Sequence, residues 1–179
     1  MMRHSRSNLV LIGMPGSGKS TVGVVLAKQH ALSFIDTDVM IQTSEKRSLQ
    51  DIVDRDGYMA LRRIEEKTLL GIAVRHHVLA TGGSAVYSEA AMGHLKSEGF
   101  VVFLDVDLPI LKARIHDFGT RGLAKAPGQS LDDLYRERLP LYRKYADLVV
   151  ECADLSQEEV SAKIIVELRA LSFRTTRRA

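Results

Sequence analysis

Short, continuously apolar segments alternate with helical segments along the whole chain, and this alternation constrains the fold more than any other feature. The apolar segments predict five strands, at about residues 8–12, 33–36, 77–80, 100–105 and 148–150. Helices are expected at about residues 19–30, 48–57, 61–74 and 130–146, and from residue 157 onward. Strands that are apolar on both faces are typical of a parallel sheet with helices on both sides. The 179 residues therefore predict one three-layer α/β domain over residues 1–179, built on a five-stranded parallel sheet.

The distribution of charge argues against a nucleic-acid partner. The chain has 25 basic and 22 acidic residues, a formal net charge of +3. Five arginines near the two ends account for this surplus, namely Arg3, Arg6, Arg174, Arg177 and Arg178. A surface that binds nucleic acid needs its basic residues on the folded body. We therefore expect no nucleic-acid partner and interpret residues 172–179 as a basic tail.

Hydropathy and cysteine content favour a cytoplasmic protein. No apolar run approaches the roughly 18 residues that a membrane-spanning helix needs. No secretory apolar segment precedes the first predicted strand. Cys152 is the only cysteine, so no disulfide can form within the chain. We expect no membrane association, a cytoplasmic location and, because no extra interface element is visible, a monomer.

The loop after the first predicted strand has the pattern G-x-x-x-x-G-K-S. Its glycines allow the backbone to wrap a phosphate, with N–H groups pointing inward at a helix N-terminus. Lys19 is expected to bridge the β- and γ-phosphates, and Ser20 to ligate Mg²⁺. The residues expected to bind the nucleotide are Gly13, Gly16, Ser17, Gly18, Lys19, Ser20 and Thr21. The guanine-reading pattern N-K-x-D does not occur, which favours ATP, and the chain length favours a small kinase.

Two carboxylates, Asp36 and Asp38, stand at the end of the second predicted strand. In an open α/β sheet, ligands bind outside the carboxyl ends of the strands. One carboxylate can hold Mg²⁺ through water, and the other can reach the hydroxyl group of a phosphoryl acceptor. The alternative is that one or both only cap the next helix.

Two adjacent glycines, Gly82 and Gly83, follow the third predicted strand and precede Ser84. Paired glycines indicate that something comes very close to the backbone. Because the carboxyl ends of parallel strands share one edge, we expect these glycines to touch the acceptor beside the transferring phosphate. The alternative is a tight strand-to-helix turn in which Ser84 is only a cap.

The order and spacing of these motifs resemble the shikimate kinase family. The matching segments are GMPGSGKST, Asp36-Thr37-Asp38, Leu61-Arg62-Arg63-Ile64-Glu65, Thr81-Gly82-Gly83, Arg121 and Arg138-Leu139-Pro140-Leu141-Tyr142. The resemblance covers about residues 8–170. It implies a P-loop kinase fold, with an acceptor-binding region at about residues 37–66 and a mobile lid at about residues 117–130. The implied reaction is ATP-dependent phosphorylation of the 3-hydroxyl of shikimate, in aromatic amino acid biosynthesis.

The resemblance also implies roles for residues on the acceptor side. Asp38 matches the aspartate that contacts the acceptor hydroxyls and is the proposed base. Asp36 matches the carboxylate on the metal side. Gly82 and Gly83 match glycines that contact the substrate near the transferring phosphate, and Ser84 follows them in the expected acceptor site.

The same resemblance implies roles for four arginines. Arg62 and Arg138 match the pair that holds the shikimate carboxylate, a task suited to the two-pronged guanidinium group. Arg121 matches the catalytic lid arginine on the γ-phosphate, and Arg114 matches an arginine that stacks on adenine. The alternatives are a surface salt bridge of Arg62 with Glu65 or Glu66 at helical spacing, and a solvated helix face for Arg138.

Three segments depart from the family pattern, and all three belong to the acceptor pocket or its cover. They are Gly82-Gly83-Ser84, Leu61-Arg62 and Arg121-Gly122-Leu123-Ala124, where the family has a triple glycine, Phe-Arg and Arg-Pro-Leu-Leu. One alternative function is therefore a kinase of another small acceptor, such as gluconate or a nucleoside monophosphate. A phosphate-bearing acceptor would need more convergent basic residues than Arg62 and Arg138, which favours a hydroxylated carboxylate. A second alternative is a nucleotide-binding module without turnover, against which the intact Lys19 and Arg121 argue.

Overall fold

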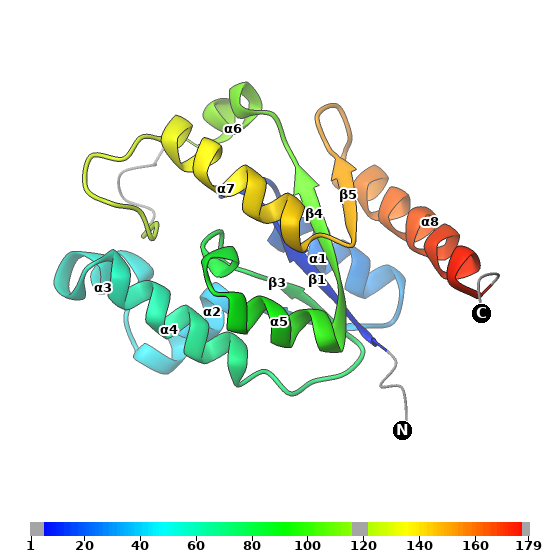
Figure 1. Cartoon of the computed structure of the whole chain (residues 1–179), viewed down its shortest axis with the longest axis horizontal. Helices are drawn as coiled ribbons and strands as arrows, with labels where there is room; N and C mark the ends of the chain where they lie inside the picture. Colours follow the sequence, from blue (N-terminus) through cyan, green and yellow to red (C-terminus); the bar gives the residue numbers. More distant parts are fainter. Residues whose placement is uncertain (1–5, 116–121, 177–179) are drawn as a thin grey trace.

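Five parallel strands form one sheet at the centre of the molecule (Figure 1). The computed structural model describes residues 6–115 and 122–176, of which residues 171–176 are described by their backbone alone. The strands are β1 (Asn8–Ile12), β2 (Ser33–Asp36), β3 (His77–Ala80), β4 (Gly99–Asp105) and β5 (Leu148–Glu151). Their order in the sheet is β2-β3-β1-β4-β5, so β1 pairs with both β3 and β4. The predicted five-stranded parallel sheet is confirmed.

Helices cover both faces of this sheet. The helices are α1 (Lys19–Gln29), α2 (Thr37–Glu45), α3 (Leu49–Asp56), α4 (Tyr58–Leu70), α5 (Glu89–Glu98), α6 (Leu108–Arg114), α7 (Leu131–Tyr145) and α8 (Gln157–Thr176), with a 3₁₀ turn η1 (Ala85–Tyr87). Helices α1 and α8 pack together on one face, and α5 and α7 lie over the other (Figure 1). Helices α2, α3 and α4 pack on one another beside β2, and α4 also packs on α5 and η1.

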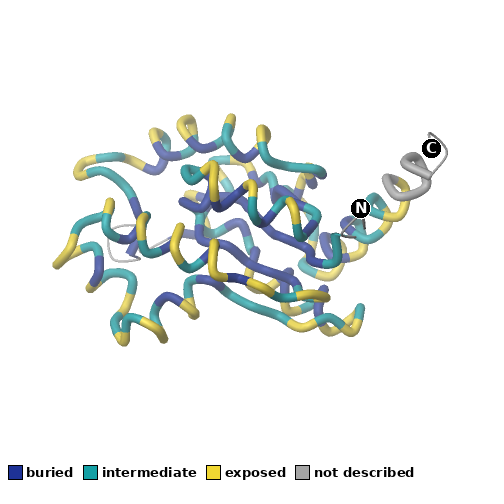
Figure 2. Tube along the Cα trace, turned by 60° about the horizontal axis from the view of Figure 1, so that its bottom comes forward, coloured by how far each residue is buried: buried dark blue, intermediate teal, exposed yellow. Residues whose placement is uncertain are grey.

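The core lies between the central strands and the helices on either side, as the dark segments of Figure 2 show. Leu11 and Val102 on neighbouring strands are fully buried. Their apolar side chains are removed from water because helices cover both faces of the sheet. The Phe103 ring stacks on the Tyr142 ring at a centroid distance of 5.0 Å, which joins β4 to α7. A smaller cluster under α2, α3 and α4 is built from Ile41, Ile52, Leu61 and Ala124.

Side-chain caps determine where several helices begin. Ser48 accepts a hydrogen bond from the Asp51 N–H and opens α3, and Ser156 and Glu159 bond reciprocally at the start of α8. Both starts were expected from the sequence. Helix α4, by contrast, begins at Tyr58 and ends at Leu70, earlier than the expected 61–74. Gly57 explains the early start, because its φ of 85° ends α3 and lets α4 follow at once.

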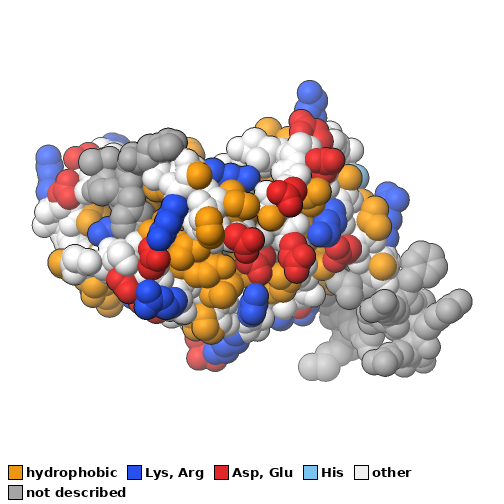
Figure 3. All heavy atoms as spheres, turned by 90° about the horizontal axis from the view of Figure 1, so that it is seen from above, with side chains coloured by type: hydrophobic (Ala, Val, Ile, Leu, Met, Phe, Trp, Pro, Cys, Tyr) orange, Lys and Arg blue, Asp and Glu red, His pale blue; other side chains and the backbone are white. Residues whose placement is uncertain are grey.

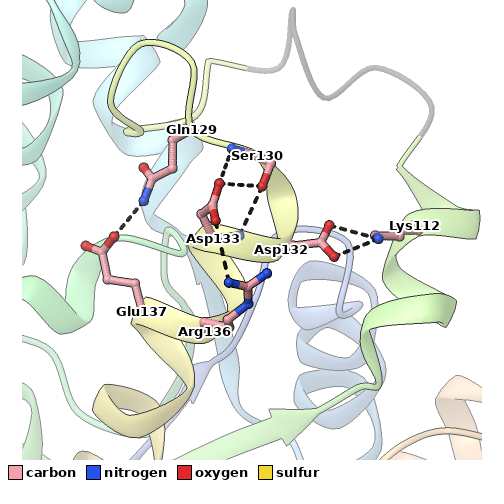
Figure 4. A network of polar contacts seen from close by, with 7 residues as sticks. All are labelled: Lys112, Gln129, Ser130, Asp132, Asp133, Arg136 and Glu137. Carbon is pink, nitrogen blue, oxygen red and sulfur yellow. Dashed lines mark hydrogen bonds and ion pairs between the residues drawn. The ribbon is translucent and has the colours of Figure 1, made fainter.

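Helices α6 and α7 bracket the predicted lid, and polar contacts hold them together (Figure 4). Lys112 on α6 contacts the Asp132 carboxylate on α7 at 2.8 Å. Gln129 donates to Glu137 at 2.6 Å, and Ser130 forms a reciprocal capping box with Asp133. Of the lid, residues 122–130 are described, and residues 117–121 lie outside the described part of the chain.

The surface carries charges of both signs. On the face seen in Figure 3, Lys and Arg side chains are interspersed with Asp and Glu side chains. Within the described parts of the chain, no helix combines the length and hydropathy needed to cross a membrane.

Candidate active site

A cavity of about 390 Å³ opens at the carboxyl ends of the central strands. The phosphate loop, α2, α4, the segment after β3, the lid and α7 all contribute to its lining. The sequence-predicted residues that line it are Gly16, Gly18, Lys19, Ser20, Thr21, Asp38, Gly82, Gly83, Ser84, Arg114 and Arg138. The fold therefore brings the two predicted halves of the site, nucleotide and acceptor, into one space.

The phosphate loop is shaped by glycines in conformations that other residues rarely adopt. Gly16 and Gly18 have φ values of 79° and 94°, so the chain can turn tightly into the first turn of α1. Lys19 is buried and donates hydrogen bonds to the carbonyl oxygens of Gly13 and Met14 at 2.9 and 2.8 Å. Burial lowers the pKa of Lys19 to about 8, which nearby Asp38 partly opposes. An anion in the loop would stabilise the charged form of this lysine.

Ser20 and Asp36 lie together beside the loop. The Ser20 hydroxyl donates to Asp36 Oδ2 at 2.6 Å. The other oxygen, Oδ1, caps α2 by accepting from the N–H groups of Asp38 and Val39 at 3.0 and 3.4 Å. Asp36 therefore both caps α2 and contacts Ser20, the other residue predicted to bind Mg²⁺. No three His, Cys, Asp or Glu side chains gather as a metal site within the described ranges, but Ser20 and Asp36 supply the hard oxygen atoms that Mg²⁺ binds alongside phosphates.

Gly82 and Gly83 make room for charged side chains of the protein itself. A methyl group on Gly82 would collide with Glu65 Oε1 and would lie 2.8 Å from Asp38 Oδ1. A methyl group on Gly83 would lie 2.8 Å from a guanidinium nitrogen of Arg138. The Gly82 N–H donates to the Thr37 hydroxyl at 3.1 Å. The close approach expected from paired glycines is thus made by Asp38, Glu65 and Arg138.

Ser84 stands at the N-cap position of η1, but it is not only a cap. No side-chain capping bond joins Ser84 to η1. Its hydroxyl instead donates to Glu65 Oε2, and both side chains are buried. Burial raises the pKa of Glu65 to about 7, and Asp38 raises it further, whereas Ser84 and Arg138 act in the opposite direction. The helical spacing of Glu65 predicts only a partnership with Arg62, and not this bond to Ser84.

Arg62 and Arg138 converge at the carbonyl oxygen of Ala124, to which they donate at 3.3 and 3.0 Å. Arg138 is only 1% exposed, so its placement on a solvated helix face is wrong. The Arg62 guanidinium lies 3.6 Å from the centre of the Tyr87 ring, a cation–π geometry. Among the described residues no ion pair joins Arg62 to Glu65 or Glu66, and the alternative of a surface salt bridge is therefore wrong.

Two aromatic residues of the site were missed by sequence reasoning. The Tyr87 hydroxyl accepts from Arg138 Nε at 3.2 Å, and the Tyr142 hydroxyl donates to the Gly83 carbonyl at 2.7 Å. Tyr142 stands inside the matched segment after Arg138, and this position was the available indication. Nothing local distinguishes Tyr87, because its partners come from α4 and α7.

The described part of the lid lies on the acceptor region. The Gly122 N–H donates to Gln50 on α3 at 2.7 Å, and a φ of 63° suits this position to glycine. Ala124 is buried in the small apolar cluster with Leu61. Arg114 ends α6 and lines the cavity, whereas Arg121 lies outside the described residues.

A parallel sheet with a phosphate loop between β1 and α1, and an acceptor cavity beside it, defines a P-loop kinase. The family model described as shikimate kinase matches residues 15–169. A shikimate kinase of Synechococcus sp. is 40% identical over 94% of this chain and 90% of its own. The chain belongs to the shikimate kinase family and is an ATP-dependent kinase.

Solved structures agree with this assignment. A shikimate kinase from Acinetobacter baumannii in complex with shikimate has a TM-score of 0.86 and 29% identity, covering 93% of this chain and 95% of that one. The shikimate kinase of Aquifex aeolicus has a TM-score of 0.80 and 32% identity, covering 92% and 98%.

Proposed function

We propose that this protein transfers the γ-phosphoryl group of ATP to the 3-hydroxyl of shikimate. The observation that carries the proposal is that Arg62 and Arg138 donate to the same carbonyl oxygen, that of Ala124. Ala124 and Arg138 line the cavity that also holds the phosphate loop, and Arg62 lies behind them, at a second cavity with Glu65 and Tyr87. Two guanidinium groups at one point suit an acceptor with a carboxylate at one end and a hydroxyl at the other.

The two arginines offer more hydrogen-bond donors than the Ala124 carbonyl can accept. Nε of Arg62 is buried and has no hydrogen-bond partner among the described residues. A carboxylate would accept from both guanidinium groups and compensate their charges in a site shielded from water. These contacts support a carboxylate-bearing acceptor over a neutral one.

On the nucleotide side, residues 13–21 bind the phosphates of ATP and Lys19 holds the β- and γ-phosphates. Ser20 and Asp36 would hold Mg²⁺, which when bound would neutralise negative charge on those phosphates. Arg114 covers the adenine. Arg121, to which the resemblance gives a role at the γ-phosphate, lies outside the described residues.

Asp38 is the proposed base. It lies in the first turn of α2, lines the cavity, and interacts electrostatically with Lys19. The acceptor oxygen forms a bond to the γ-phosphorus while the bond to the β–γ bridging oxygen breaks. The hydroxyl proton passes to the Asp38 carboxylate. Gly82 leaves room for Asp38, Gly83 leaves room for Arg138, and both leave room for the acceptor between them.

The whole chain acts as one kinase domain, as a monomer and in the cytoplasm, with no nucleic-acid partner. The mixed surface charge seen in Figure 3 supports the last point. Size-exclusion chromatography with light scattering measures the oligomeric state, and a dimer at micromolar concentration contradicts the proposal of a monomer.

The acceptor is tested with purified protein and Mg-ATP. Shikimate, gluconate and nucleoside monophosphates are supplied separately, and release of ADP is followed in a coupled assay. We expect turnover with shikimate. Clear turnover of another acceptor, without turnover of shikimate, contradicts the proposed function.

Arg62→Ala tests the arginine pair. We expect the KM for shikimate to rise about tenfold or more, because a charged hydrogen bond is lost, while the KM for ATP changes little. Arg63→Ala is the matched control, since Arg63 is the exposed neighbour on the same helix. An equal rise in both KM values for Arg62→Ala would mean that Arg62 is structural.

A further inference from the structure

Ser84 and Glu65 form a buried polar pair at the wall of the acceptor cavity. Ser84 follows β3, Glu65 lies on α4, and both line the cavity. They are 8% and 3% exposed, so neither side chain is satisfied by bulk water. The serine hydroxyl donates to Glu65 Oε2 and leaves the other carboxylate oxygen, Oε1, for a different partner.

Glu65 Oε1 is buried and has no hydrogen-bond partner within the described residues. An unpaired carboxylate oxygen away from water is costly, so a native site that keeps one needs a donor to reach it. Oε1 is next to the space above Gly82, where a methyl group would collide with it. That space belongs to the acceptor cavity.

Asp38 approaches the same space from α2. A methyl group on Gly82 would lie 2.8 Å from Asp38 Oδ1, so two carboxylates of different helices face one point. Two further charged groups interact electrostatically with Glu65, namely Arg62 on the same helix and Arg138 on α7. Lys19 of the phosphate loop also interacts electrostatically with the Glu65 carboxylate. A hydroxyl group of the acceptor suits the space between these two carboxylates, because it can donate a hydrogen bond to one of them without adding negative charge.

We propose that Ser84 is a positioning residue that holds Glu65 so that Oε1 accepts a hydrogen bond from an acceptor hydroxyl next to the one phosphorylated. This inference rests on the proposed function and adds a contact that determines specificity. Glu65 recognises a neighbouring hydroxyl, whereas Asp38 serves the reacting one. Ser84 acts only through Glu65.

The test compares Ser84→Ala with Ser84→Thr in the intact protein. Alanine keeps Cβ but removes the donor, whereas threonine keeps the hydroxyl. We expect the KM for shikimate to rise about tenfold in Ser84→Ala and to remain near the wild-type value in Ser84→Thr. The KM for ATP should change less than twofold in both. Ser161→Ala is the control, because its buried hydroxyl donates to Gln29, which lies outside the cavity.

The pH profile separates positioning from packing. The Ser84 hydrogen bond favours the ionised form of Glu65, and only an ionised Oε1 accepts freely. In the wild type, kcat/KM for shikimate should therefore rise as pH increases through about 7. In Ser84→Ala the same rise should move to higher pH, because the pKa of Glu65 increases. A merely structural role would lower activity without moving the profile.

An acceptor analogue without the neighbouring hydroxyl completes the test. With the analogue, the tenfold difference between wild type and Ser84→Ala should disappear, since no donor then reaches Glu65. An unchanged KM for shikimate in Ser84→Ala, or an unmoved pH profile, overturns the inference. Failure of the wild type to turn over shikimate would instead contradict the proposed function, so the two failures are distinguishable.

Discussion

The nucleotide side of the cavity is one continuous segment of chain, whereas the acceptor side is assembled from five separate ones. Residues 13–21 form the phosphate loop with backbone groups and a single buried lysine. The acceptor side takes Asp38 from α2, Glu65 from α4, Ser84 from the segment after β3, Ala124 from the lid and Arg138 from α7. A backbone loop binds any phosphate of suitable shape, while recognition of the acceptor depends on side chains and their neighbours.

The two sides also differ in how their polar groups are paired. Lys19 bonds to carbonyl groups of its own loop, so this contact is internal to one segment. Arg138 instead joins α7 to Tyr87 and to the lid carbonyl of Ala124. A substitution on the acceptor side therefore disturbs several elements at once, whereas a substitution of Lys19 disturbs one segment.

The largest effect is expected for Lys19→Ala. Removing the charge that stabilises the transferring phosphate should lower kcat by about a thousandfold, whichever acceptor is used. Steady-state kinetics measure the change, and Lys28→Ala, at the exposed far end of α1, is the control. A loss below tenfold would mean that the loop backbone alone stabilises the transferring group.

Arg138→Lys should affect the acceptor alone. Lysine keeps the charge but lacks the planar fork, so two charged hydrogen bonds are lost. The KM for shikimate should rise about a hundredfold and the KM for ATP less than threefold. The control is Arg136→Ala on the same helix, an arginine whose side chain is 75% exposed. A comparable rise in the KM for ATP would contradict the division of the cavity into two sides.

Glu65→Gln should change how stability depends on pH. The pKa of Glu65 is raised from 4.5 to about 7, so the folded protein binds this proton more tightly than the unfolded chain. Its contribution to stability is therefore complete below pH 4.5 and is lost as pH rises to about 7, by on the order of 3 kcal/mol.

Denaturant unfolding at a series of pH values measures this effect. Glu65→Gln should gain stability relative to the wild type between pH 4.5 and 7, because glutamine does not titrate. The exposed neighbour Glu66→Gln should show no such trend. A constant difference between Glu65→Gln and the wild type across this range would show that Glu65 titrates normally.

Lys112→Ala is expected to have the smallest effect. The pair with Asp132 joins α6 to α7 at the surface (Figure 4), with side chains 51% and 35% exposed. Exposed pairs contribute about 0–1 kcal/mol, so the free energy of unfolding should fall by about 0.5 kcal/mol or less. Both KM values should stay within twofold. A larger rise in either KM would mean that this contact controls the lid.

Local features of the sequence were enough to predict the sheet, the phosphate loop and two helix starts. Ser48 and Ser156 cap their helices through residues three positions along, so the information lies within one turn. The start of α4 was predicted too late, because Gly57 both ends one helix and admits the next. A glycine in the sequence predicts a helix end, but it does not indicate that a second helix begins at the next residue.

The acceptor site could be predicted only in part. The resemblance named Arg62 and Arg138, but not the Ala124 carbonyl that they share, which lies 62 residues from Arg62. The Ser84–Glu65 pair joins residues 19 positions apart, in a strand-end turn and a helix. No periodicity links such positions.

The sequence by itself determined the layer order, the phosphate loop and the shikimate kinase family of this chain. Those features depend on the propensities of short segments and on one contiguous motif, and both can be recognised in the sequence without the tertiary structure. The tertiary structure decided that Glu65 turns to Ser84, that Arg62 lies on Tyr87, and that paired glycines admit the protein's own charges. The physical reason is burial: charged groups removed from water must find partners, and only the folded chain decides which groups are near enough.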